Sequence, residues 1–148
     1  MRPIRILIVD DSTTIRAMLE EVLSRERDFE LVGSAPDADT ASKMIRQHWP
    51  DVTTIDVEMP GRDGLSLLEQ VREATRVVML TSHPEALEAA FEQGAYAFFD
   101  KGRILQDAKK LTAIIRTTAA GKYSGVPRRP RPTESEAGSE DEPAPPPI

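Results

Sequence analysis

The sequence predicts an α/β fold in which helices cover both faces of a doubly wound, five-stranded parallel sheet. Short apolar runs recur at fairly even spacing through about residues 1–120 of the 148-residue chain, and helical patterns lie between them. Helical crossovers between successive strands force parallel pairing with right-handed connections. Five strand–helix pairs in this order are typical of an open sheet with helices on both faces.

The strands are predicted from the apolar runs. Four runs end at polar or charged residues, and these are Ile6–Val9, Val52–Ile55, Val77–Leu80 and Ala97–Phe99. The second strand is predicted near Phe29. The predicted strands therefore begin near Ile4, Phe29, Val52, Val77 and Ala97.

The helices are predicted from apolar residues at intervals of three and four positions. The second helix follows Asp37 and Asp39, either of which can cap it. The fourth is expected to start near Pro84 and to stop at Gly94. The apolar positions of the five helices are Ile15, Met18, Leu19, Val22 and Leu23; Ala41, Met44 and Ile45; Leu65, Leu68 and Val71; Ala86, Leu87, Ala90 and Phe91; and Ile104, Ala108, Leu111 and Ile115.

Composition and charge limit the classes of function. A hydrophobic content of 39% suits a domain of ordinary size, and the net charge of −6 argues against nucleic-acid binding by simple electrostatics. The chain has no cysteine, which excludes disulfides and thiolate metal sites. Neither a secretory signal nor an apolar stretch near the roughly 18 residues of a membrane span is visible. We therefore expect a soluble, cytoplasmic protein without membrane insertion.

The composition changes near Gly121. Residues 121–148 hold seven of the twelve prolines, and they are basic first, then acidic, then proline-rich. Such a segment cannot bury enough apolar surface to offset the entropy of ordering it. We predict a domain at residues 1–120 and a disordered tail at 121–148, which is either a solvated extension or a peptide-like docking segment.

Polar residues follow four of the predicted strands. Asp10 and Asp11 end the first run, Asp56 ends the third, Thr81 ends the fourth, and Lys101 comes soon after the fifth. The carboxyl ends of parallel strands lie side by side, and chemistry in open α/β sheets is found at that edge. Because close carboxylates repel unless a proton or cation intervenes, a hard divalent cation such as Mg²⁺ is expected there.

Most of these residues also have a purely structural interpretation. Asp-Asp-Ser-Thr before an amphipathic helix is a good capping signal, although Ser12 or Thr13 suffices as the cap. Thr81 could cap the helix that follows it, and Lys101 could extend its stem along a strand end. Asp56 lies well before the next helix, so that capping explains it poorly. The ordered occurrence of all these residues at strand ends favours a shared site.

Taken together, the motifs resemble a two-component receiver domain over about residues 3–120. The domain content resembles stand-alone chemotaxis receivers, because we expect no methylesterase domain in the chain. The resemblance implies a flavodoxin-like, CheY-like fold with CheB-like motifs, and a phosphorylation-switched regulator that is not an enzyme on an external substrate. The matching segments are Ile8–Ser12, Asp56–Pro60, Asp63-Gly64, Thr81-Ser82 and Lys101, with Asp-Val-Glu-Met-Pro and Ala35-Pro36-Asp37 most similar to receivers of chemotaxis methylesterases.

The resemblance implies that Asp56 accepts a phosphoryl group from a histidine kinase. It also implies that Asp11 binds Mg²⁺ directly, that Asp10 binds it mainly through water, and that the carbonyl of Glu58 supplies another ligand. A carboxylate is a competent nucleophile that forms a labile acyl phosphate. The phosphoryl transition state spreads charge over three oxygens, which Mg²⁺, an ammonium group and a hydroxyl can neutralise.

Further roles are implied for residues beside the nucleophile. Thr81 would bind a phosphoryl oxygen and report phosphorylation by moving, and Lys101 would pair with another oxygen. Phe98 stands where the family has its switch aromatic, and its alternative is an ordinary core residue. Dephosphorylation could be tuned by Glu58, Ser82 and His83. An unidentified output protein is expected to bind the face formed by the fourth helix, fifth strand and fifth helix.

The chain departs from the family pattern after the lysine, where Gly102 stands in place of the usual proline. The Lys101–Gly102 bond is expected to be trans, because a cis bond without proline costs roughly 3 kcal/mol.

Several other functions stay open at this stage. Within signalling, a phosphate sink or a phosphorylation-independent adaptor would have the same motifs. A haloacid-dehalogenase-like phosphatase would need Asp-x-Asp-x-Thr after the first strand, whereas Asp10 and Asp11 are adjacent. A flavodoxin-like cofactor module is disfavoured because the loop after Asp11 lacks glycine and the two carboxylates would repel phosphate.

Overall fold

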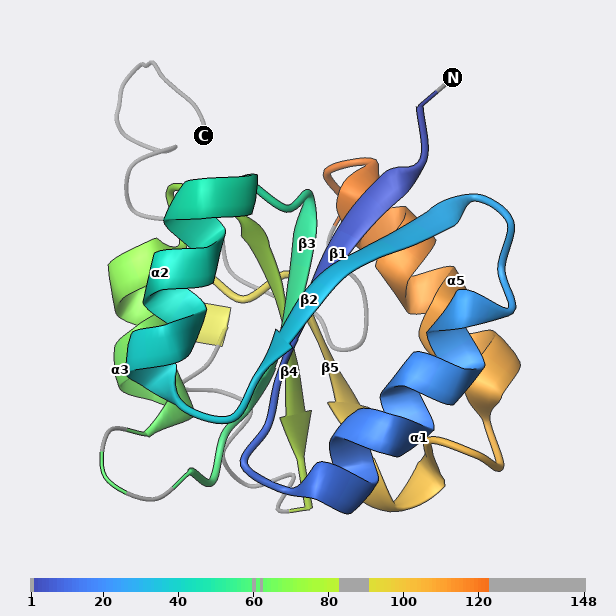
Figure 1. Cartoon of the computed structure of the whole chain (residues 1–148), viewed down its shortest axis with the longest axis horizontal. Helices are drawn as coiled ribbons and strands as arrows, with labels where there is room; N and C mark the ends of the chain where they lie inside the picture. Colours follow the sequence, from blue (N-terminus) through green and yellow to red (C-terminus); the bar gives the residue numbers. More distant parts are fainter. Residues whose placement is uncertain (1, 60, 62, 83–90, 123–148) are drawn as a thin grey trace.

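The computed structural model describes residues 2–59, 61, 63–82 and 91–122 of the chain. Its sheet has the strand order β2-β1-β3-β4-β5, and every neighbouring pair is parallel (Figure 1). The predicted doubly wound parallel sheet is therefore confirmed. The strands are β1 (Ile4–Val9), β2 (Phe29–Ala35), β3 (Val52–Asp56), β4 (Arg76–Thr81) and β5 (Ala97–Asp100).

Helices cover both faces of this sheet, with α1 and α5 on one side and α2 and α3 on the other (Figure 1). Alternate residues of each central strand face the two layers. Ile6 and Ile8 of β1 pack in the cluster that includes α1 and α5, whereas Leu7 and Val9 pack in the cluster with α2 and α3. The helices are α1 (Thr13–Ser24), α2 (Ala38–His48), α3 (Gly64–Val71) and α5 (Ala108–Ala119).

Short polar side chains start three of the helices. Ser12 accepts a hydrogen bond from the backbone N–H of Ile15 and caps α1. Asp37, rather than Asp39, caps α2, and Asp63 caps α3 in the same way. Because Ser12 suffices for α1, the capping interpretation does not account for Asp10 and Asp11.

The fifth helix begins later than the sequence pattern indicated. Ile104, the first apolar position of the expected pattern, lies in a turn between a short 3₁₀ helix (Lys101–Arg103) and α5, although its side chain is fully buried. Asp100 caps the 3₁₀ helix through the N–H of Gly102. The expectation from Ile104 was wrong because the spacing of apolar residues indicated which side chains are buried and not where the continuous helix begins.

Part of the fourth predicted helix lies outside the described residues, which resume at Phe91. Its predicted stop at Gly94 fits the structure, because Gly94 has a φ of 110° and its N–H donates to the carbonyl of Phe91 at 3.1 Å. Residues 121 and 122 close the end of α5. The tail from residue 123 onward also lies outside the described residues, so its predicted disorder stays a prediction.

The sheet brings the polar strand ends to one edge. Val9 pairs with Ile55 in register, Asp56 pairs with Leu80, and Thr81 pairs with Asp100. The central strands are almost entirely buried, which holds their carboxyl ends firmly in place. Across the described ranges, the helices are too short or too polar to cross a membrane.

The loop after β3 returns so closely to the strand that it requires glycine at position 64. A β-carbon there would lie 2.1 Å from the carbonyl oxygen of Asp56 and 2.9 Å from the Cα of Val57. Both atoms belong to the backbone, so that the strand end itself would have to move.

We therefore predict that Gly64→Ala lowers the free energy of unfolding by about 2 kcal/mol or more, as measured by urea denaturation. Gly33→Ala is the matched control, because its nearest atom is the flexible end of Met44 at 3.1 Å. Equal losses in the two variants would contradict the argument.

Candidate functional site

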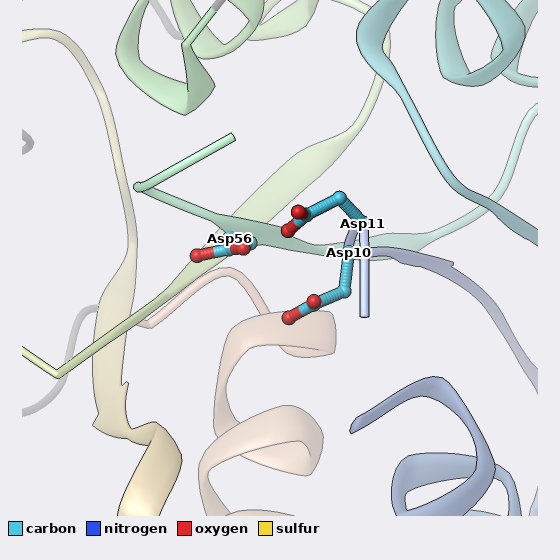
Figure 2. A group of neighbouring side chains, drawn as sticks. All are labelled: Asp10, Asp11 and Asp56. Atoms are coloured by element: carbon cyan, nitrogen blue, oxygen red, sulfur yellow. The ribbon is translucent and has the colours of Figure 1, made fainter. Parts of the chain in front are cut away.

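Three carboxylates meet at the carboxyl edge of the sheet, as the sequence predicted. Asp10 and Asp11 follow β1, Asp56 ends β3, and one oxygen of each lies within 4.8 Å of the others (Figure 2). Asp10 and Asp56 are fully buried, whereas Asp11 is exposed. The site therefore has a buried floor of two acids and one acid at its solvent-facing rim.

Each buried carboxylate keeps one oxygen without a hydrogen bond. The Oδ1 of Asp56 accepts from the N–H of Glu58 at 3.0 Å, and the Oδ1 of Asp10 accepts from the N–H of Ser12 at 2.8 Å. Within the described part of the chain, the Oδ2 atoms of both residues have no hydrogen-bond donor. Buried acceptors in this state are costly, and a bound cation would satisfy them.

Lys101 supplies the positive charge of the site. Its Nζ lies 3.0 Å from Asp56 and 3.6 Å from Asp10, and the side chain is only 15% exposed. The Lys101–Gly102 bond is trans, as predicted. The N–H of Gly102 donates to Asp100 at 2.8 Å, which fixes the turn that carries the lysine even though proline is missing.

Burial and neighbouring charges shift the pKa values of Asp56, Asp10 and Lys101. Burial raises the pKa of Asp56 to about 7, and the negative charge of Asp10 adds to this rise, while Lys101 opposes it. Burial also raises the pKa of Asp10, against the N–H of Ser12 and the charge of Lys101. Burial disfavours the ammonium of Lys101, but its contact with Asp56 and the charges of both acids raise its pKa overall. The single ammonium group of Lys101 therefore does not balance the negative charge of the neighbouring carboxylates.

The hydroxyl of Thr81 contacts a residue that the sequence analysis did not pair with it. Thr81 ends β4, is almost fully buried, and donates to the Oε2 of Glu58 at 2.8 Å. Glu58 lies two positions after Asp56 and is exposed. Local sequence could not reveal this pair, because it depends on the 57–59 segment folding back toward the end of β4.

The remaining predicted residues lie around this centre. Ser82 follows Thr81 and is exposed, and His83 lies outside the described residues. Phe98 of β5 is half-buried and meets the ring of Phe91 edge to face, with 6.2 Å between the centroids. Phe98 therefore lies on β5, which β4 separates from the strand of Asp56, on the side of the sheet where Thr81 and Lys101 lie.

A family model described as the response regulator receiver domain matches residues 6–118. This chain belongs to that family. The resemblance to a two-component receiver domain, inferred from the strand-end motifs, is thereby confirmed.

The curated relatives are longer than the chain. A protein-glutamate methylesterase/protein-glutamine glutaminase of Pseudomonas aeruginosa is 39% identical over 91% of this chain and 42% of its own length. A relative of the same description from Methylobacillus flagellatus is 44% identical over 68% of this chain and 30% of its own length. The chain thus spans less than half the length of either relative and matches the receiver part.

Solved structures show the same fold. The response regulator domain of Thermotoga maritima CheB has a TM-score of 0.76 at 32% identity, and the match covers 80% of this chain and 98% of that one. A chain of the CheX–CheY–BeF₃–Mg²⁺ complex of Borrelia burgdorferi has a TM-score of 0.63 at 26% identity, over 75% of this chain and 90% of that one. The receiver fold is therefore shown by sequence and by structure.

The raised pKa of Asp56 predicts a pH dependence of stability. The pKa rises from an ordinary value of 3.8 to about 7, so the folded protein holds this proton more tightly than the unfolded chain does. The stabilisation is fully present below pH 4 and is lost as the pH rises through 7. In metal-free buffer, the free energy of unfolding should therefore fall by about 2–4 kcal/mol more in the wild type than in Asp56→Asn across this window. Urea denaturation at a series of pH values measures this free energy for both proteins. Identical pH profiles in the wild type and Asp56→Asn would contradict the prediction.

Proposed function

We propose that this chain is a phosphorylation-switched signalling receiver whose phosphoacceptor is Asp56. The observation that carries the proposal is a buried carboxylate 3.0 Å from an ammonium group and beside two further acids at the edge of the sheet. Membership of the receiver family supports a histidine kinase as the phosphoryl donor. We also place the chain in the cytoplasm on the basis of this family.

The residues fit a magnesium ion. Asp10, Asp11 and Asp56 offer oxygen ligands within 4.8 Å of one another, and two of these acids have a buried oxygen without a hydrogen bond. Hard divalent cations prefer such carboxylate oxygens, and Mg²⁺ keeps several waters when few carboxylates are available. The carbonyl of Glu58 is proposed as a further ligand. When bound, the ion would neutralise charge on the carboxylates and on the transferring phosphoryl group. The similar Borrelia burgdorferi complex contains both Mg²⁺ and BeF₃, which supports this choice of ion.

In the proposed reaction, a carboxylate oxygen of Asp56 attacks the phosphorus of the donor. A new O–P bond forms while the bond to the donor nitrogen breaks, and the nitrogen keeps the electron pair. Asp56 must be deprotonated to attack, and the ammonium of Lys101 favours that state from 3.0 Å. The same ammonium is placed to contact an oxygen of the transferred group. We propose that these residues catalyse this transfer and the later hydrolysis of the acyl phosphate, in which water takes the phosphoryl group and the Asp56 carboxylate is regenerated, and that they act on no external substrate.

The switch is proposed to act through Thr81. Its hydroxyl donates to Glu58 at 2.8 Å, so contact with a phosphoryl oxygen on Asp56 requires it to leave that carboxylate. Thr81 is paired with Asp100, and Phe98 lies on the same short strand, which links the site to β5. We propose that β5, α5 and the predicted fourth helix form the output face. Glu58, Ser82 and His83 are proposed to tune dephosphorylation.

We predict that Asp56→Asn abolishes labelling by a radioactive histidine-kinase donor or acetyl phosphate, because an amide cannot form the acyl phosphate. The control is Asp63→Asn, which changes an acid in the following loop and leaves a side-chain oxygen to cap α3. Labelling of Asp56→Asn at the wild-type level would refute the assignment.

Magnesium binding gives a separate prediction. Mg²⁺ should raise the melting temperature of the wild type, because a ligand of the folded state stabilises it as RT ln(1 + [L]/Kd). Asp11→Ala should abolish most of this shift, whereas Glu69→Ala, an exposed acid on α3, should keep it. Differential scanning fluorimetry with and without Mg²⁺ measures both. An undiminished shift in Asp11→Ala would remove that residue from the ligand set.

A further inference from the structure

A cavity of about 540 Å³ opens at the amino edge of the sheet, opposite the acids. It is formed by the segment between α2 and β3, the segment before β4, and the residue before β5. The proposed function leaves this cavity without a role. Its lining includes Trp49, Pro50, Arg72, Thr75, Arg76 and Tyr96.

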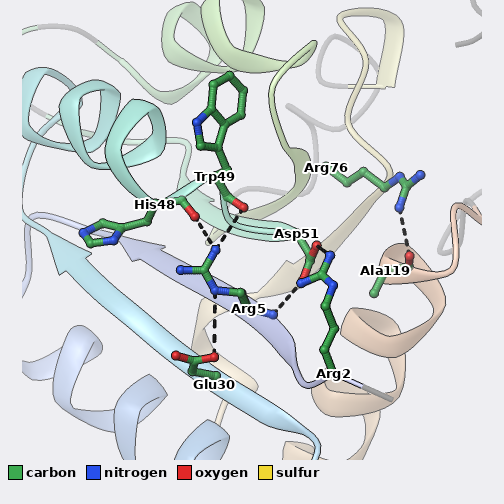
Figure 3. Close-up of polar contacts among 8 residues, drawn as sticks. All are labelled: Arg2, Arg5, Glu30, His48, Trp49, Asp51, Arg76 and Ala119. Atoms are coloured by element: carbon green, nitrogen blue, oxygen red, sulfur yellow. Dashed lines mark hydrogen bonds and ion pairs between the residues drawn. The ribbon is translucent and has the colours of Figure 1, made fainter.

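Trp49 presents its indole to solvent from a fixed backbone. It caps the end of α2 with a φ of 49°, which is uncommon for a bulky residue, and its N–H donates to Ile45. The guanidinium of Arg5 holds the carbonyl of His48 and reaches that of Trp49 at 3.5 Å, while the indole points away from this network (Figure 3). The side chain is 62% exposed. A rigidly held, exposed tryptophan is suited to contact with an apolar partner.

Two arginines give the cavity a positive charge. Arg72 donates to the carbonyl of Gln93 at 3.0 Å. Arg76 donates to the carbonyl of Ala119 at 2.8 Å, as Figure 3 shows. These carbonyl partners are neutral. Among the described residues, Arg72 also forms an ion pair with the exposed Glu73, whose carboxylate lies 3.9 Å from it. A pair of this kind is worth little. A guanidinium has five N–H donors, so both arginines retain donors for an anionic group.

The other acid of the cavity wall is already neutralised. The carboxylate of Asp51 accepts two hydrogen bonds from Arg2, at 2.8 and 3.2 Å, and a third from the N–H of Arg5 at 2.8 Å (Figure 3). The guanidinium of Arg76 also lies 5.7 Å from the ring centroid of Tyr96. The wall therefore combines aromatic rings with positive charge.

The chain itself supplies a complementary segment. The end of α5 lies against Arg76, and a β-carbon on Gly121 would be 3.6 Å from its Nη2, so the described part of the chain ends beside the cavity. Glu140-Asp141-Glu142 is followed by Pro143 and by Pro145-Pro146-Pro147. Acidic side chains complement arginine, and proline segments dock on aromatic-lined grooves.

The part of the tail between Lys122 and Glu140 suits a tether. It begins with basic residues that the arginines of the cavity repel, and a tether of 17 residues would span on the order of 25 Å. A tether of this length can return to a cavity that lies beside the start of the tail. The basic residues at the start of the tail are Lys122, Arg128, Arg129 and Arg131.

We propose that the segment Glu140–Pro147 docks in this cavity within the same chain. The acidic residues contact Arg72 and Arg76, and the prolines cover Trp49 and Tyr96. The sequence allowed the tail to be either a solvated extension or a peptide-like docking segment, and the proposal chooses the docking segment. The proposal is independent of phosphorylation, because the cavity and Asp56 lie at opposite ends of the strands.

Trp49 is the only tryptophan of the chain, so its fluorescence tests the proposal directly. The full-length triple variant Glu140→Gln/Asp141→Asn/Glu142→Gln is compared with wild type by acrylamide quenching. A tethered segment has an effective concentration on the order of 1 mM, so a segment with a Kd below that value is docked in the wild type and covers Trp49. The variant releases the segment, and the acrylamide quenching of Trp49 should therefore rise roughly twofold. Glu134→Gln/Glu136→Gln is the matched control and should behave as wild type. Equal quenching in the wild type and the triple variant would overturn the proposal.

Arg72→Gln tests the other side of the contact. It should raise quenching as the triple variant does, and combining the two should add nothing further, because both remove one interaction. Arg103→Gln, at the opposite edge, is the control, and circular dichroism verifies folding. Additive effects would overturn the proposed contact. A wild-type signal that depends on protein concentration would instead assign the segment to a second copy and overturn docking within one chain.

Discussion

The receiver site depends on the balance between two fully buried carboxylates and one ammonium group. Lys101 lies between Asp10 and Asp56 and neutralises one negative charge. Burial raises the pKa of both acids, and the charge of a neighbouring carboxylate adds to the rise in each. Each acid also keeps an oxygen with no hydrogen bond among the described residues. A second cation or a proton would therefore stabilise the site, and this is the physical basis for the metal binding and phosphoryl chemistry proposed at this edge.

The rigidity of the surrounding sheet turns that charge balance into a signal. Asp10 and Asp56 extend from strands buried on both faces, so the floor of the site resists displacement. Thr81 and Lys101 instead lie beside the short strand β5, and Thr81 holds Glu58 by a side-chain hydrogen bond that can exchange partners. We therefore propose that a change of charge on Asp56 acts mainly on β4 and β5, where Phe98 packs against Phe91.

The two ends of the strands have opposite chemistry. The carboxyl edge gathers acids, whereas the amino edge carries Arg72 and Arg76 beside Trp49 and Tyr96. Parallel topology makes this separation possible, because every strand starts at one edge and ends at the other. A docking event at the arginine-rich edge can therefore coexist with phosphorylation at the acidic edge.

The local pattern of the chain predicted the five strands and the presence of α1, α2 and α3. It also predicted the meeting of Asp10, Asp11 and Asp56, because parallel strands must bring their carboxyl ends together. Tertiary structure alone decided that Asp10 is buried while Asp11 is exposed, that Thr81 bonds to Glu58, and that Ile104 is buried in a turn before α5. It also decided that Trp49 and Arg76 share a cavity. These features arise from contacts between residues far apart in the chain, and periodicity carries information only about neighbours on one strand or helix.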